Sequence, residues 1–136
     1  MTKTIFISLP VADLAASAAF YKALGFEQNA QMSDGSTAAC MAWSETIQVM
    51  LLTHAKWRTF TQRPLPAAGS AGHMLSLAME SRAAVDAMNE AAAANGGKAD
   101  ANPAEDYGFM YSRDLADLDG HLWGVFWMDA VAAAAA

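Results

Sequence analysis

The sequence has few charged residues and almost no cysteine. Of 136 residues, 16% are charged, and Cys40 is the single cysteine. One thiol cannot form a disulfide within the chain, which is consistent with a reducing compartment, so the expected location is cytoplasmic. Cys40 lies in the apolar stretch 38–43, and we interpret it as a buried, unreactive thiol rather than a nucleophile.

Long hydrophobic runs and basic stretches are also missing. No apolar run approaches the ~20 residues of a transmembrane helix, so no membrane partner is expected. The net charge is -6, and no stripe of lysine or arginine exists to neutralise phosphates, which argues against nucleic acid as a partner. The apolar N-terminal stretch is short and interrupted by Ser8 and Pro10, which favours a first strand over a signal peptide.

The sequence does contain apolar residues, at 54% of the chain, enough to form a substantial core. A chain of this length fits one domain, so we expect residues 1–136 to form a single domain. Within it we predict two copies of one strand-helix-strands unit. Module one spans about 3–53, a connector 54–71 and module two about 72–129, and the alanine-rich tail 130–136 is given no role in the fold.

The elements of both modules follow from periodicity and capping residues. In module one, Asp13 caps a helix that ends at Gly25. In module two, the helix runs from about Ser81 to Ala94. The predicted strands are 4–11, 26–32, 37–43 and 46–52 in module one, and 73–79, 97–101, 108–114 and 121–128 in module two.

Two stretches carry a resemblance to a known family. They are Leu9-Pro10-Val11-Ala12-Asp13-Leu14, continued by Ser17, Phe20-Tyr21 and Leu24-Gly25-Phe26, and Asp119-Gly120-His121-Leu122-Trp123. With the two-module order, they resemble the glyoxalase/bleomycin resistance protein/extradiol dioxygenase (vicinal oxygen chelate) superfamily, and most of all its bacterial lactoylglutathione lyase-like members. The resemblance implies an α+β fold in which two βαβββ modules form a half-barrel cleft that binds ligand. It also implies a homodimer.

The resemblance further locates four positions at which enzymes of the family hold a divalent metal, usually with His on each first strand and Glu on each last strand. These positions fall on Phe6, Gln48, either His73 or Met74, and Gly124. The internal repeat favours Met74, because a one-residue slip would turn His73 to the opposite face of its strand. A phenyl ring and a glycine cannot bind a metal and an amide binds weakly, so we predict no metal and no other cofactor.

Strand alternation and the resemblance together predict which side chains line the cleft. Most are apolar or aromatic, as is usual in pockets for small organic molecules. Gly124 is expected to open room where the Glu of family enzymes projects. The predicted ligand-binding residues are Phe6, Gln48, Met50, Trp57, His73, Tyr107, Phe109, Tyr111, Gly124 and Phe126.

Three functions are compatible with these residues, and whether the chain is an enzyme is left open. We predict a protein that binds a small organic ligand without metal, as antibiotic-sequestering members of the family do. The alternative is a metal-dependent lyase, or related enzyme, acting on a small carbonyl compound. A metal-independent enzyme would use Tyr107, Tyr111 or His73 as acid or base. We interpret His121 as part of the Asp119-Gly120 turn.

Overall fold

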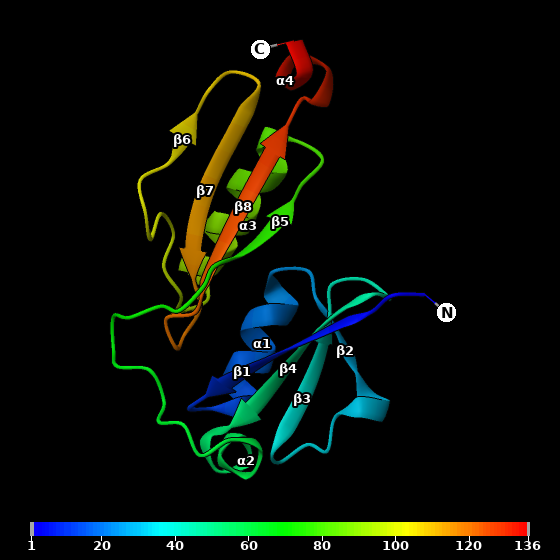
Figure 1. The fold of residues 1–136 in the computed structure, drawn as a ribbon, viewed down its shortest axis with the longest axis vertical. Helices are drawn as coiled ribbons and strands as arrows, with labels where there is room; N and C mark the ends of the chain where they lie inside the picture. The colour runs from blue at the N-terminus through cyan, green and yellow to red at the C-terminus, as the bar shows by residue number, and fades with distance from the viewer. Residues whose placement is uncertain (1, 136) are drawn as a thin grey trace. The chain divides into compact units, whose positions relative to one another are not determined.

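The computed structural model describes residues 2–135. The chain divides after residue 67 into two compact units, unit 1 and unit 2. The boundary falls within the predicted connector 54–71 (Figure 1). None of the helices in residues 2–135 is long and apolar enough to cross a membrane.

Unit 1 is a four-stranded sheet with one long helix. The sheet order is β1-β4-β3-β2, in which β1 is parallel to β4 and the other pairs are antiparallel. Its elements are β1 (Ile5–Val11), α1 (Leu14–Ala23), β2 (Glu27–Asn29), the 3-10 helix η1 (Ala30–Met32), β3 (Ala38–Ala42), β4 (Ile47–Thr53) and α2 (His54–Phe60).

Unit 2 repeats this topology. The sheet order is β5-β8-β7-β6, with β5 parallel to β8 and the other pairs antiparallel. The predicted α+β fold of two similar modules is therefore confirmed. The elements of unit 2 are β5 (Leu75–Ala78), α3 (Arg82–Ala94), β6 (Glu105–Asp106), β7 (Met110–Ala116), β8 (Leu122–Met128) and α4 (Ala130–Ala135).

The two long helices begin where capping residues predict. The Asp13 carboxylate accepts a hydrogen bond from the Ala16 amide at 3.0 Å, and the Ser81 hydroxyl accepts one from the Ala84 amide at 3.1 Å. Each bond satisfies an amide that has no partner within the helix. After α1 the chain turns at Gly25, whose φ of 105° suits glycine.

Residues 97–101 do not form the predicted strand. They contribute only an isolated bridge between Lys98 and Ala116, and the fourth strand of unit 2 is β6. Asp100 has a φ of 49°, which is incompatible with a regular strand, and its carboxylate binds the Arg113 guanidinium through two 2.9 Å hydrogen bonds. Side-chain contacts thus replace backbone pairing in this segment.

The alanine-rich tail forms α4 rather than an irregular end. The Asp129 carboxylate accepts hydrogen bonds from the amides of Val131 and Ala132, at 3.1 and 3.2 Å. The cap of this helix is therefore Asp129, the last residue before the tail. Within the described part of the tail, the helix is one short segment after β8 (Figure 1).

Candidate ligand-binding faces of the two sheets

In unit 1, α1 covers one face of the sheet and the predicted residues lie on the other. Tyr21 of α1 contacts the Phe26 ring edge-on at 5.2 Å, and Phe26 contacts Trp43 at 5.1 Å. Trp43 follows Ala42, which pairs with Gln48. Because neighbouring residues of a strand point to opposite faces, Gln48 lies on the face opposite α1. We call the sheet face opposite α1 or α3 the distal face.

The distal face of unit 1 holds three of the predicted residues together. Phe6 pairs with Gln48, and Ser8 pairs with Met50, so these side chains lie side by side on neighbouring strands. The Phe6 ring is 48% exposed, whereas Gln48 is 7% exposed. Phe6 is therefore an accessible aromatic side chain, and Gln48 is part of the packed interior.

The amide of Gln48 is fully engaged by its own hairpin. Its Oε1 accepts a hydrogen bond from the Cys40 thiol at 3.3 Å. Its Nε2 donates to the carbonyl oxygens of Ser44 and Glu45, at 3.2 and 3.3 Å. Cys40 is fully buried, and burial raises the pKa of its thiol, which favours the protonated form. The predicted burial of Cys40 is confirmed, and Gln48 shapes the β3–β4 turn.

Unit 1 also has two surface pockets, of ≈ 510 Å³ and ≈ 670 Å³. The first is lined by Gln48 with Glu45 and Trp43, and the second lies beside α1 at Asp13 and Lys22. Of the ten predicted ligand-binding residues, Gln48 lines the first pocket and none lines the second. These pockets therefore do not gather the predicted residues.

In unit 2, the distal face carries a polar group beside Gly124. Gly124 pairs with Ser76 on one side and Asp114 on the other. A Cβ atom at position 124 would lie 2.8 Å from the Ser76 Oγ and 3.4 Å from the Asp114 Oδ1. The absence of a side chain at position 124 thus makes room for the Ser76 hydroxyl, so the open room expected in place of a Glu was wrong.

Asp114 is a residue of this face that sequence reasoning missed. Its Oδ2 accepts a hydrogen bond from the Asn102 amide at 2.9 Å, and its side chain is half-buried. The signal was available in the alternation of β7, which places Ser112 and Asp114 on one face and Tyr111 and Arg113 on the other. Phe126, which pairs with Ser112, shares the distal face.

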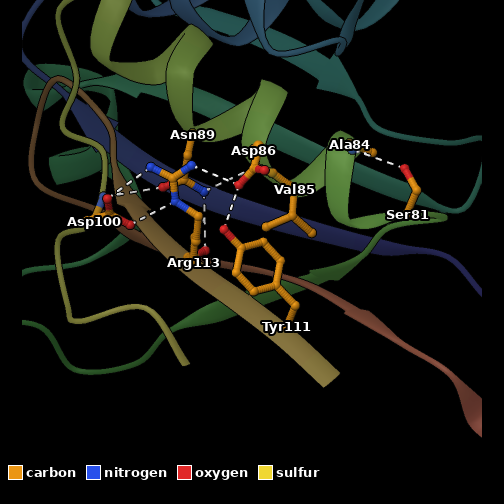
Figure 2. Close-up of polar contacts among 8 residues, drawn as sticks. All are labelled: Ser81, Ala84, Val85, Asp86, Asn89, Asp100, Tyr111 and Arg113. Atoms are coloured by element: carbon orange, nitrogen blue, oxygen red, sulfur yellow. Dashed lines mark hydrogen bonds and ion pairs between the residues drawn. The ribbon is translucent and has the colours of Figure 1, made fainter. Parts of the chain in front are cut away.

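The opposite face of unit 2 is covered by α3 and held by a network of charged side chains (Figure 2). Arg113 binds Asp86 of α3 at 2.9 Å and Asp100 at 2.9 Å. The Tyr111 hydroxyl donates to the same Asp86 carboxylate at 2.6 Å. The fully buried Asn89 accepts from the Asp100 amide at 3.3 Å and donates to the Arg113 carbonyl at 3.3 Å.

This network contradicts the prediction that Tyr111 lines the same face as Gly124 and Phe126. Tyr111 pairs with Trp127, which alternates with Phe126, so its ring lies on the α3 face. There the Arg82 guanidinium stacks over the rings of Tyr111 and Trp127, at 5.0 and 5.2 Å. The hydrogen bond to Asp86 raises the pKa of Tyr111, which makes it a poorer acid.

The other predicted residues lie outside the regular strands. Tyr107 and Phe109 stack at 6.4 Å before β7 begins, and Tyr107 is 57% exposed, with its hydroxyl donating to Glu105 at 2.9 Å. Trp57 lies half-buried on α2, and His73 is exposed ahead of β5. The ligand-binding role of these four residues stays a prediction.

Comparisons with known proteins agree with this arrangement. Residues 3–42 match the family model described as bleomycin resistance protein-like N-terminal. No curated protein matches the chain.

Solved structures match over nearly the whole chain. Hypothetical protein SA1046 from S. aureus has a TM-score of 0.78 and 25% identity, and the match covers 93% of this chain and 95% of that one. A glyoxalase/bleomycin resistance protein/dioxygenase family enzyme from Burkholderia phytofirmans PsJN has a TM-score of 0.75 and 16% identity, over 94% and 100% of the two chains. A glyoxalase/bleomycin resistance protein from Albidiferax ferrireducens T118 has a TM-score of 0.68 and 23% identity, and the match covers 91% of this chain and 97% of that one.

The family-model match over residues 3–42 and the fold shared with these solved structures support the glyoxalase/bleomycin resistance protein/dioxygenase superfamily predicted from the sequence. The lactoylglutathione lyase-like subgroup stays a prediction.

The two units of this chain can be matched residue by residue through their hairpins. The β3–β4 and β7–β8 loops have equal length: Ala42 pairs with Gln48 across the first, and Ala116 pairs with Leu122 across the second. The counterpart of Gln48 in unit 2 is therefore Leu122 rather than Gly124. Gln48 and Gly124, the positions that the resemblance implies on the two last strands, therefore differ by two residues, a shift that keeps the same face of the strand.

The parallel strand pairs give the same correspondence. Ser8 pairs with Met50 in unit 1, and Ser76 pairs with Gly124 in unit 2. Met50 is thus the counterpart of Gly124.

The first strands settle which residue corresponds to Phe6. Since Ser76 matches Ser8, the residue two positions earlier, Met74, matches Phe6. The helix caps that follow at equal spacing, Asp13 and Ser81, agree. His73 is therefore displaced by one residue, as the internal repeat predicts, and neither His73 nor Met74 lies within β5.

Phe6 and Gly124, two of the metal positions that the resemblance implies, thus have Met74 and Met50 as their counterparts in the other unit. A phenyl ring, two thioethers and a glycine do not fit a divalent metal, which prefers carboxylate and imidazole ligands. Among residues 2–135 no three His, Cys, Asp or Glu side chains are grouped closely enough to hold a metal ion. We derive no chemistry through a metal at these positions.

Proposed function

We propose that the protein binds a small organic ligand on the distal faces of its sheets, without a metal. The observation that carries this proposal is that Phe6 and Gly124, with their counterparts Met74 and Met50, offer neither a carboxylate nor an imidazole to a metal. The face keeps side chains suited to apolar contact, and the Phe6 ring is 48% exposed. Burying an exposed aromatic ring against a ligand is favourable by about 25 cal/mol per Å².

The residues at these positions also favour ligand binding over lyase chemistry, because they lack the groups that a lyase would need. The lyases that the sequence resembles need a divalent metal and, usually, a metal-bound Glu as base. Gly124 offers no carboxylate, and Met50 offers a thioether in the corresponding place. The homodimer and the cytoplasmic location remain predictions from the sequence.

A thermal-shift screen over small metabolites and antibiotics tests the proposal. A compound that binds only the folded chain raises the midpoint of unfolding, because saturation at 100 times Kd adds about 2.7 kcal/mol to stability. We expect a set of aromatic or apolar compounds to do so in metal-free buffer. Phe6→Ala is expected to remove the shift for those compounds.

Phe60→Ala is the matched control for this screen. Phe60 is also an exposed ring, at 68%, but it lies on α2 and not on a strand. The proposal predicts that Phe60→Ala keeps the shifts that Phe6→Ala loses. A screen without hits, or hits that respond equally to both substitutions, would contradict it.

A further inference from the structure

Asp114 on the distal face of unit 2 is a carboxylate without a counter-ion. Among the described residues, the ion pairs join Arg82 to Asp106 and Arg113 to Asp86 and Asp100, and none includes Asp114. Arg113 is its neighbour in β7 but points to the α3 face. A half-buried carboxylate without an ion pair is free to attract a cation.

One oxygen of the Asp114 carboxylate is hydrogen-bonded, and the other has no donor among the described residues. Asn102 donates to its Oδ2 at 2.9 Å, and among the described residues no donor binds its Oδ1. That oxygen lies 3.4 Å from the point where a Cβ of residue 124 would be, and the Ser76 Oγ lies 2.8 Å from the same point. A hydroxyl and a carboxylate oxygen therefore flank one place over β8.

An aromatic ring lies next to this place. Phe126 is on the same face, two residues beyond Gly124, and its ring is half-buried. Its cross-strand partners are the small residues Ala78 and Ser112. The Asp114 carboxylate on β7, the Ser76 hydroxyl on β5 and the Phe126 ring on β8 are therefore neighbours on one face of the sheet.

We propose that Ser76, Asp114 and Phe126 form a subsite, the Asp114 subsite, for the ammonium group of an arylalkyl amine. The ammonium donates to the free carboxylate oxygen and to the Ser76 hydroxyl, and the aryl group packs on Phe126. A cation is further favoured by the ring face of Phe126. This inference rests on the proposed binding function and specifies the charge of the ligand.

Isothermal titration of the full chain with two probes of equal size tests the subsite. 2-Phenylethylamine carries the ammonium group, and 2-phenylethanol replaces it with a neutral hydroxyl. The amine is expected to bind at least about tenfold more tightly than the alcohol, the effect of one charge-assisted hydrogen bond. Asp114→Asn is expected to abolish this preference, because the neutral amide has no charge to attract the ammonium group.

Glu90→Gln is the matched control, because it removes the same charge from the exposed side of α3. It is expected to keep the amine preference. If Asp114→Asn fails to fold, Ser76→Ala replaces it and is expected to weaken the amine more than the alcohol.

Three results would overturn the subsite: equal affinity for amine and alcohol, equal effects of Asp114→Asn and Glu90→Gln, or no binding of the amine at about 10 mM. The proposed function fails separately, when the thermal-shift screen yields no ligand at all. Neutral hits in that screen combined with no amine preference would retain the proposed function and reject the subsite.

Discussion

At the scale of single residues, the most constrained position is Gly124. Its φ is ordinary, so the reason for glycine is the close approach of neighbouring side chains and not backbone conformation. The Ser76 hydroxyl would lie 2.8 Å from an added Cβ, a distance at which atoms overlap. Gly124 therefore allows β5, β7 and β8 to bring a hydroxyl and a carboxylate together.

Gly124→Ala is expected to destabilise the protein by about 1–3 kcal/mol, the usual cost of overpacking. The measurement is the free energy of unfolding in urea. Gly72→Ala is the control, because Gly72 has no atom within 4 Å of an added Cβ and no positive φ. An equal loss for both variants would contradict the account of Gly124.

Cys40 is predicted to be unreactive in the folded protein. It is fully buried, its thiol is bound to Gln48, and burial raises its pKa, so little thiolate is available. Dithiobis(nitrobenzoate) should label it at least about 100-fold more slowly in the native state than in guanidinium. Comparable rates in the two conditions would refute this description.

At the scale of elements, helix caps and strands could be predicted from the sequence, whereas segments held by side-chain networks could not. Asp13, Ser81 and the alternating strands could be identified from sequence, because a cap or a strand depends on residues close in the chain. The segment 97–101 could not, because Asp100 is fixed by Arg113, which is distant in sequence. The correspondence between β4 and β8 cannot be read from alternation for a related reason: a two-residue shift leaves the pattern of faces unchanged.

The Arg113 network is expected to hold residues 95–106 against α3. Arg113→Met removes the hydrogen bonds to Asp86 and Asp100, so backbone amides of this segment should exchange with deuterium at least about tenfold faster. Arg63→Met, an exposed position in the connector, is the control and should change nothing there. Unaltered exchange in Arg113→Met would show that the backbone alone fixes the segment.

The Arg82–Asp106 pair, which joins α3 to β6, gives a pH dependence of defined sign. The Arg82 guanidinium lowers the pKa of Asp106 from 3.8 to about 2, so the pair stabilises the folded state above pH 3.8. That contribution is lost as pH falls from 3.8 toward 2, because the carboxylate is then protonated. The free energy of unfolding in urea should fall less between pH 5 and pH 3 for Arg82→Gln than for the wild type. An equal fall in both proteins would contradict this role of the pair.

At the scale of the whole molecule, the two-module organisation was predictable and the site only in part. Alternation correctly grouped Phe6 with Gln48 and Met50, and Gly124 with Phe126. It could not reveal that Gln48 is hydrogen-bonded to Cys40, that Tyr111 bonds to α3, or that Asp114 lies beside Gly124. Those facts depend on packing and register between strands, which a single sequence does not encode locally.

The central claim is that the superfamily's metal site has been replaced by apolar and small residues. Mass spectrometry of metals in protein incubated with nickel, zinc, manganese and iron and then desalted tests it most directly. The account predicts far less than one ion per chain, with no difference between wild type and Gln48→Ala. One ion per chain that is lost on substitution of Gln48 or His73 would contradict it.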